Sequence, residues 1–278
     1  MRRTLSRRIF LADLGKGGLA AAVGVGLIAC GGDDDESPAA TAAASEPTAG
    51  GSPVATVTAA TGAGIGGSEA TAAAPANGGS GSALAAVEWG RANLGFVSAY
   101  VLARGGEATI VDTGVEGSEA QIEAALAALG LGWDAVGHVV VTHLHGDHAG
   151  SLPAVLDSAP SATGYAGAAD ISGIRSPREL VAVGDGDQVF GLEIIETPGH
   201  TAGHVSVLDP VGGVFVAGDA INGVDGGVVG PNPQFSPDMG AANESVVKIA
   251  ALEFETILFG HGEPVLSQGA AQVGSLVG

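Results

Sequence analysis

Four side chains that can bind a metal ion stand close together in the stretch THLHGDH, at positions 142–148. The stretch follows a run of three valines, which predicts that it lies at the carboxyl end of a β-strand. Alternate residues of an extended chain share one face, so His143 and His145 can point at one ion. A turn at the next glycine can direct Asp147 and His148 toward a second ion.

Imidazole and carboxylate ligands in this combination suit zinc, iron or manganese, and two such ions together are a common device for activating water. The chain has only seven histidines, and three of them lie in this stretch. The alternative is a polar loop between a strand and a helix that holds histidines by chance. The spacing favours a site for two divalent cations, with zinc as the first choice and iron or manganese as alternatives.

Three further apolar runs end in a histidine or an aspartate. The run at 192–197 leads through a Pro-Gly turn to His200, which predicts a third ligand for the first ion. The next run ends in Asp219, a carboxylate that can bridge two cations and reduce their mutual repulsion. The last run ends in His261. If these strand ends meet at one edge of a sheet, ligands from distant parts of the chain converge on one site.

Four other polar residues have two interpretations each. Asp112 follows an expected strand at 108–111, where it can orient a ligand imidazole or simply form a turn. His204 begins another expected strand, and we interpret it as a structural residue or a neighbour of the ligands. Arg175 and Arg178 can orient an anionic group of a substrate, but a solvated loop is the favoured interpretation.

The elements that carry these residues alternate between strands and helices. Residues 116–129 have apolar side chains at helical spacing and end at a glycine, so they predict an amphipathic helix, and a second helix is expected at 149–156. A loop rich in glycine and proline, residues 222–237, is expected to overhang the site. Other strands are expected at 84–88, 95–103, 138–141, 162–165 and 204–208.

The amino-terminal residues are typical of a targeting segment. Residues 6–11, SRRIFL, resemble a twin-arginine export signal, and the apolar run at 19–29 is too short for an ordinary spanning helix. The run ends in LIACG, which resembles a bacterial lipobox; the resemblance implies cleavage before Cys30 and lipidation of this only cysteine. The alternative is a plain signal anchor. We expect residues 1–30 to be a signal peptide, and the protein to be exported and lipid-anchored to the outer face of the bacterial cell membrane.

Composition divides the rest of the chain in two. Residues 31–82 hold no aromatic side chain and almost no Leu, Ile or Phe, which predicts a disordered linker. Residues 83–278 are the expected catalytic domain. They carry five basic and twenty-three acidic side chains, so nucleic acid is an unfavourable partner. The expected partners are a small-molecule substrate and, through the lipid anchor only, a membrane.

The motifs THLHGDH, TPGHTAGH, FVAGD and FGHG, in this order, resemble the metallo-β-lactamase superfamily over about residues 87–266. The resemblance implies an α/β fold of the αββα kind, a four-layer sandwich with two facing sheets and a dinuclear site at one edge. It also implies roles for the candidate residues: His143, His145 and His200 bind the first ion, Asp147, His148 and His261 bind the second, Asp219 bridges them, and Asp112 orients a ligand.

The ligand set is similar to that of glyoxalase II-like thioesterases, which implies a metal-dependent hydrolase of a small ester, thioester or lactone. Asp147 and Asp219 are the expected catalytic side chains. The β-lactamases of this fold carry Cys or Ser at the position of Asp219, so β-lactam turnover is less favoured. Basic residues that recognise glutathione, and the substrate-facing tyrosine of lactonases, have no match here. Two competing interpretations are a mononuclear iron enzyme similar to persulfide dioxygenases and a non-enzymatic metal-binding lipoprotein.

Overall fold

The computed structural model describes residues 84–278. The expected signal peptide, the linker and Cys30 lie outside these residues. Within the described part of the chain, no helix combines the length and the apolar character that crossing a bilayer requires.

Two sheets form the centre of the described domain. The first sheet has six strands in chain order, with the first three antiparallel and the others parallel. Its strands are β1 (Glu88–Asn93), β2 (Ser98–Arg104), β3 (Glu107–Val111), β4 (Val136–Val141), β5 (Thr163–Gly167) and β6 (Val181–Val183).

The second sheet has five strands in the order β13-β10-β9-β8-β7, and only β10 and β13 pair in parallel. These strands are β7 (Gln188–Val189), β8 (Leu192–Glu196), β9 (Val205–Asp209), β10 (Val214–Gly218) and β13 (Thr256–Phe259). A separate hairpin, β11 (Asn222–Val224) and β12 (Gly227–Val229), forms within the segment expected to be a loop.

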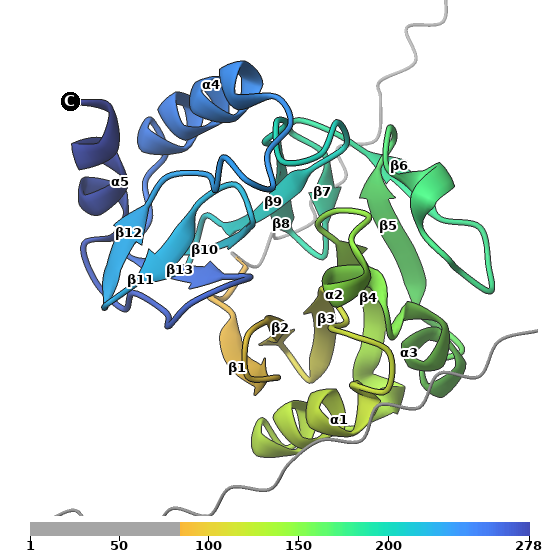
Figure 1. The fold of residues 1–278 in the computed structure, drawn as a ribbon. Helices are drawn as coiled ribbons and strands as arrows, with labels where there is room; N and C mark the ends of the chain where they lie inside the picture. The colour runs from red at the N-terminus through yellow and green to blue at the C-terminus, as the bar shows by residue number, and fades with distance from the viewer. Residues whose placement is uncertain (1–83) are drawn as a thin grey trace, which may run out of the picture. The chain divides into compact units, whose positions relative to one another are not determined.

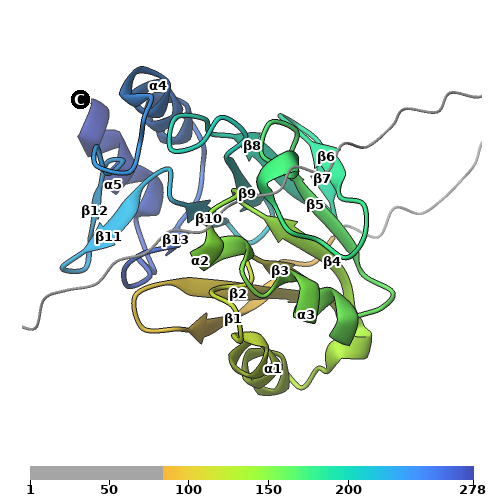
Figure 2. The same cartoon turned by 45° about the vertical axis from the view of Figure 1, so that its right-hand side comes forward.

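Helices cover the outer faces of both sheets (Figure 1). The helices are α1 (Glu119–Ala128), α2 (Gly146–Ala149), α3 (Leu152–Ser158), α4 (Met239–Ala250) and α5 (Gly269–Val277), with 3-10 turns at Trp133–Ala135 and Ile171–Gly173. In both views, α1 and α3 lie beside the first sheet, and α4 and α5 lie beside the second (Figure 2).

Three apolar clusters confirm the expected αββα sandwich. Val139 of β4 packs with α1 and α3, whereas its neighbour Val140 packs in the cluster between the sheets. In β10, Val216 joins the same central cluster, and Phe215 packs with α4 and α5. Adjacent residues of a strand point to opposite faces, so a strand covered on both faces is apolar throughout. This double burial explains the continuous valine-rich runs that precede the candidate ligands.

Several expected boundaries were wrong. The first strand begins at Glu88, so the strand expected at 84–88 does not form; the Val87 N–H instead donates to the Asp209 carboxylate at 2.9 Å. The strand expected at 95–103 begins at Ser98, because residues 94–97 turn, with Gly95 at φ 91°. Both differences arise from tertiary contacts and turns, which apolar patterning does not encode.

Helices α4 and α5 were not expected. In α4, the Asp238 carboxylate caps the first turn by accepting from the Ala241 N–H at 3.0 Å. The buried face combines Ala242 and Ser245 with Val246 and Ile249. Asp238 before the helix and the helical spacing of Val246 and Ile249 were both readable signals for it.

Candidate metal centre

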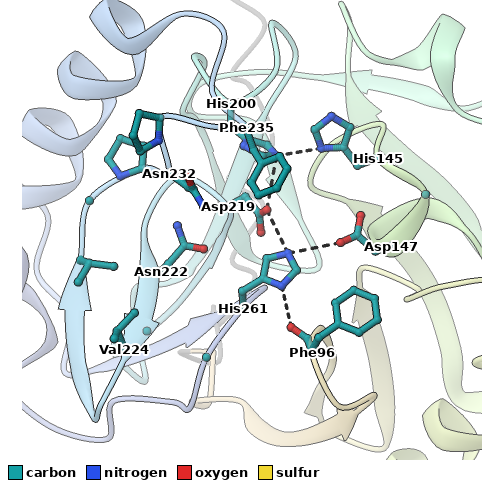
Figure 3. A pocket seen from close by; sticks show the side chains of 17 residues that line it. Phe96, His145, Asp147, His200, Asp219, Asn222, Val224, Asn232, Phe235 and His261 are labelled. Atoms are coloured by element: carbon teal, nitrogen blue, oxygen red, sulfur yellow. Dashed lines mark hydrogen bonds and ion pairs between the residues drawn. The ribbon is translucent and has the colours of Figure 1, made fainter.

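The candidate ligands meet where strands of both sheets end, and not at the edge of one sheet as expected. His143 follows β4 of the first sheet, and the rest of the THLHGDH stretch continues into α2. The other ligands follow strands of the second sheet: His200 lies between β8 and β9, Asp219 follows β10 and His261 follows β13. Figure 3 shows labelled side chains from both sheets turned toward one another.

The first candidate group is His143, His145 and His200. Each ring offers a nitrogen, and these three atoms lie within 4.8 Å of one another. His200 Nε2 is 2.9 Å from His145 Nδ1, and the rings of His143 and His145 meet nearly edge to face. The arrangement leaves the three nitrogens facing a common point, as ligands of one cation do.

The second candidate group is Asp147, His148 and His261, whose ligand atoms also lie within 4.8 Å of one another. Asp147 Oδ2 is 3.4 Å from His261 Nε2 and 3.9 Å from His148 Nε2. His148 is buried, whereas Asp147 and His261 are partly exposed. This group can therefore hold a cation on the side of the site that faces solvent.

Asp219 contacts members of both groups. Its Oδ2 atom is 3.4 Å from His200 Nε2 and 3.3 Å from His261 Nε2. Its Oδ1 atom is 3.3 Å from His148 Nε2. A single carboxylate placed in this way can share its charge between two cations.

The donors fit divalent cations. His143 Nε2, His148 Nε2 and Asp219 Oδ1 are buried and have no hydrogen-bond partner among the described residues. Buried polar atoms without partners are costly, so they indicate a ligand. In a tetrahedral zinc site, each ligand atom lies about 2.0–2.1 Å from the zinc, so any two ligand atoms lie roughly 3.3 Å from each other. The contacts made by Asp219 match this separation.

Asp112 orients two of the imidazoles. Its Oδ2 atom accepts from His148 Nδ1 at 2.8 Å and from the Thr142 hydroxyl at 2.9 Å. The Thr142 oxygen in turn accepts from His143 Nδ1 at 3.0 Å. Both neutral rings then carry their proton on Nδ1 and offer Nε2 to the site. Asp112 adopts φ 62°, a left-handed conformation that aspartate tolerates.

Two glycines allow the close approach of these groups. At Gly260, an added Cβ would collide with the Asp219 carboxylate and with His148. At Gly218, which has φ 54°, a Cβ would lie 2.6 Å from His204 Nε2. The glycines of the FVAGD and FGHG motifs are therefore required by the packing of the site.

Without a metal, the neighbouring carboxylates favour the protonated forms of His148 and His261, whereas burial lowers the pKa of His143 and His200. Burial alone lowers the pKa of His148, but Asp112 and Asp219 outweigh this effect and raise it to about 10. Hydrogen bonds to Asp147 and Asp219 raise the pKa of His261 to about 10. A metal must displace these protons, because only the neutral imidazole is a ligand.

Metal affinity is therefore expected to rise with pH. Between about pH 6 and pH 9, both histidines of the metal-free protein are protonated, so each displaced proton raises the apparent affinity by up to about tenfold per pH unit. Calorimetry in buffers of different ionisation enthalpy counts the released protons. An affinity that is independent of pH over this range, with no proton release, would contradict the expectation.

Asp170 is a residue near the site that sequence reasoning missed. It is buried, and its carboxylate accepts from the Leu144 N–H at 3.0 Å, the Thr201 hydroxyl at 2.6 Å and the Gly203 N–H at 2.8 Å. It thus ties the loop that carries His143 and His145 to the loop that carries His200. The aspartate stands in a stretch without clear periodicity, so the sequence contained no signal for this role.

His204 is buried and holds the backbone of Asp219. The Asp219 N–H donates to His204 Nε2 at 3.0 Å, and His204 Nδ1 lies 2.7 Å from the Thr197 hydroxyl. Burial lowers the pKa of His204 to about 3, so the ring is neutral and donates from Nδ1. The Thr197 hydroxyl then donates to Ser206 at 2.9 Å, and Ser206 donates to the Ala217 carbonyl at 3.0 Å.

Replacing His204 with leucine is expected to destabilise the protein by about 1–3 kcal/mol, because the buried Asp219 N–H loses its acceptor and the buried Thr197 hydroxyl loses its donor. The metal content should fall as well, since His204 no longer fixes the backbone of Asp219. Thr197→Val, which keeps the imidazole and removes its acceptor, should show a smaller loss of the same kind. Denaturant unfolding and metal analysis measure both effects. Wild-type stability and metal content in both variants would refute the positioning role.

Arg175 and Arg178, the two arginines that could have oriented a substrate, lie away from the cavity at the metal centre. Arg178 donates to the Leu156, Ala159 and Pro160 carbonyls at the end of α3, a common way to satisfy the last carbonyls of a helix. Arg175 is exposed, and neither arginine lines the cavity at the metal centre.

A cavity of about 990 Å³ adjoins the ligands. Its walls include His145, Asp147, His200, Asp219 and His261. The hairpin of β11 and β12 and the segment that follows it, residues 230–235, form much of the remaining wall. The region expected to overhang the site therefore borders it.

Comparisons with known proteins agree with this geometry. The model of the metallo-beta-lactamase superfamily matches residues 92–261, more than half of the chain. A probable metallo-hydrolase of Bacillus subtilis (strain 168), YflN, is 43% identical over 82 residues, 26% of this chain and 31% of the relative. A hydroxyacylglutathione hydrolase of Parasynechococcus marenigrum (strain WH8102) is 31% identical over 132 residues, 44% of this chain and 50% of the relative. The chain thus spans half or less of the length of these two relatives.

Solved structures share the fold. A metallo-beta-lactamase family protein of Thermus thermophilus, TTHA1429, aligns with a TM-score of 0.56 and 21% identity over 68% of this chain and 77% of its own. The metallo-beta-lactamase FIM-1 of Pseudomonas aeruginosa, in its mono-zinc form, aligns with a TM-score of 0.53 and 22% identity over 65% and 82% of the two chains. With the family match over more than half of its length, the chain belongs to the metallo-beta-lactamase superfamily.

Proposed function

We propose that this protein is a metallo-hydrolase that uses two divalent cations, with zinc as the first choice, to hydrolyse a small ester, thioester or lactone. The observation that carries the proposal is the position of Asp219, whose oxygens lie 3.3–3.4 Å from ligand atoms of both histidine groups. A site for a single structural ion needs no such shared carboxylate. The hydroxyacylglutathione hydrolase relative, whose name denotes hydrolysis of a thioester, supports this substrate class.

Each cation has its own ligands in this proposal. His143, His145 and His200 hold the first, and Asp147, His148 and His261 hold the second, with Asp219 common to both. When bound, the cations supply Lewis-acid chemistry, which acidifies water and polarises a carbonyl group.

The protein's own groups set up the attack. A hydrogen bond from His261 lowers the pKa of Asp147, against the effect of burial. Asp147 therefore stays ionised and, because it lines the cavity, can accept a hydrogen bond from the attacking water and orient it. Burial raises the pKa of Asp219, but His148 and His261 hold it well below its usual range. Its negative charge is thus available to both cations at neutral pH.

Metal-stripped and reconstituted protein tests the proposal. The full chain is treated with a chelator, reloaded with zinc, manganese or iron, and assayed on ester, thioester, lactone and cephalosporin panels. We expect hydrolysis in the ester, thioester or lactone panel, lost on stripping and restored by metal. If the protein hydrolyses only cephalosporins, it is a β-lactamase and the proposal is wrong. If it binds one iron per chain and consumes oxygen with a persulfide, it is similar to persulfide dioxygenases and the proposal is also wrong.

We further propose that the protein is exported and held at the membrane by a lipid on Cys30. The support is the SRRIFL and LIACG motifs of the sequence. Cys30→Ala should move the protein from the membrane fraction to the soluble fraction, since Cys30 is the only possible attachment site of this kind. Fractionation of producing cells, with wild type beside the variant, measures the shift. Unchanged membrane association of the variant would refute the lipid anchor.

A further inference from the structure

Beyond the ligands, the cavity at the metal centre is walled by exposed apolar side chains. Phe96 is 62% exposed, Phe235 57%, Val224 52% and Val229 39%, and all four line this one cavity. In Figure 3, the Phe96 and Phe235 rings flank the cluster of ligands, and Val224 lies on a third side. Large apolar side chains exposed together around a cavity indicate that a ligand covers them.

The apolar walls come from segments far apart in the sequence. Phe96 stands in the turn between β1 and β2, where its carbonyl accepts from His261 Nδ1 at 2.7 Å and its ring stacks on the His261 ring. The valines stand on the hairpin of β11 and β12, and Phe235 follows that hairpin. Two prolines, Pro231 and Pro233, continue the same wall. Apolar side chains from distant segments therefore meet around the metal centre and form one apolar wall.

No lysine or arginine of the described residues reaches this surface. The residues of the described chain that line the cavity include no lysine or arginine. The five lysines and arginines of residues 84–278 are placed elsewhere: Arg91 pairs with Glu263, Arg104 with Asp209 and Lys248 with Asp185, Arg178 caps α3, and Arg175 is exposed outside the cavity lining. Away from the ligands, the polar side chains of the wall are the neutral amides Asn222 and Asn232. A charged tail would lose its hydration here without gaining a counter-charge.

We propose that the preferred substrate is an uncharged ester or lactone with an apolar acyl arm, which packs against Phe96, Phe235 and the valines of the β11–β12 hairpin. This inference rests on the proposed hydrolase function and narrows its substrate class. It disfavours acyl derivatives with an anionic tail, such as a glutathione thioester with its two carboxylates. The metal centre acts on the carbonyl, and the apolar wall selects the arm.

A series of 4-nitrophenyl esters from acetate to octanoate tests the inference on the metal-loaded full chain. Each added methylene should raise kcat/KM by up to about fourfold, because the methylene leaves water on binding. The mono-4-nitrophenyl ester of succinate, which has a chain of similar length to the butyrate ester but carries a negative charge, should be at least about tenfold poorer than the butyrate ester. A flat series, or preference for the succinate ester, would overturn the inference.

Two variants locate the effect in the cavity wall. Phe235→Ala should reduce the ratio of kcat/KM for octanoate to that for acetate. Val224→Lys should reverse the preference between the butyrate and succinate esters. Val247→Lys is the matched control, because Val247 is 58% exposed on α4 and does not line the cavity, so its preferences should equal those of wild type. If Val224→Lys and Val247→Lys change the preference between the two esters equally, the wall does not select the acyl arm and the inference is overturned.

Binding without turnover separates this inference from the hydrolase proposal. Octanamide should raise the Tm of the wild-type protein more than acetamide does, and Phe235→Ala should reduce the difference. If no ester is hydrolysed but octanamide still binds in this way, the apolar wall is supported and the hydrolase proposal fails. If esters are hydrolysed but octanamide and acetamide have equal effects, the hydrolase proposal is supported and the apolar wall is overturned.

Discussion

Asp219→Ala is expected to reduce kcat/KM for the ester or thioester substrate by on the order of 1,000-fold, because two cations without a shared carboxylate repel each other and lose part of their several kcal/mol of charge stabilisation. Bound metal should fall at the same time. The fold should persist, since the ion pairs of the Asp219 side chain are all with candidate ligands. Steady-state kinetics, elemental analysis and circular dichroism measure the three effects.

Asp185→Ala is a suitable control for this variant. Asp185 is exposed and pairs with Lys248, outside the residues that line the cavity, so activity and metal content should stay at wild-type levels. Normal turnover by Asp219→Ala would rule out a dinuclear mechanism. Loss of activity with full metal content would instead assign Asp219 a role in the chemistry that does not depend on metal retention.

Asp112→Asn is expected to weaken metal binding by about 10- to 100-fold, the usual effect of losing a partner that orients metal ligands. Asparagine has nearly the same shape, tolerates the left-handed φ of 62°, and can still accept from the Thr142 N–H, which donates to Oδ1 at 2.7 Å. Its amide group, however, presents N–H donors to His148 Nδ1 and the Thr142 hydroxyl, which are donors themselves. Titration with a metal-binding competitor dye gives the affinities.

A second buried aspartate provides the control. Asp209 accepts from backbone N–H groups and from Arg104 beside the start of β10, whereas Asp219 follows the end of that strand. Asp209→Asn should lower stability without changing metal affinity. If both variants lose affinity equally, general destabilisation explains the effect, and the orienting role of Asp112 would be wrong.

The ligands could be predicted from the sequence because each follows a strong signal. Buried strands read as continuous apolar runs, and a His or Asp directly after such a run stands out. The αββα layers were expected from the resemblance that these motifs carry. The residues alone also suggested that all the ligands lie at the edge of a single sheet. This was wrong, because His143 and Asp219 follow strands of different sheets. Which strands share a sheet depends on pairing between distant segments, and apolar patterning does not record it.

Asp170 was missed, whereas His204 was expected as a structural residue or a neighbour of the ligands, but without its partners. Asp170 and His204 act through hydrogen bonds to backbone groups of other loops, at Gly203 and Asp219. Such contacts depend on the final packing and leave no period in the sequence. Helix α5, residues 269–277, was missed because its two glycines, Gly269 and Gly274, lower its helix propensity. The apolar wall was equally hidden, since Phe96 and Phe235 are single aromatic residues in turns.

The number of metal ions that activity requires is the most direct test of the dinuclear site. Stripped full-length protein is titrated with zinc, and both bound metal and ester hydrolysis are followed. We expect about two equivalents to bind per chain, with hydrolysis reaching its maximum only when the second is bound. Full hydrolysis at one equivalent, or hydrolysis that survives complete removal of metal, would contradict the two-cation mechanism.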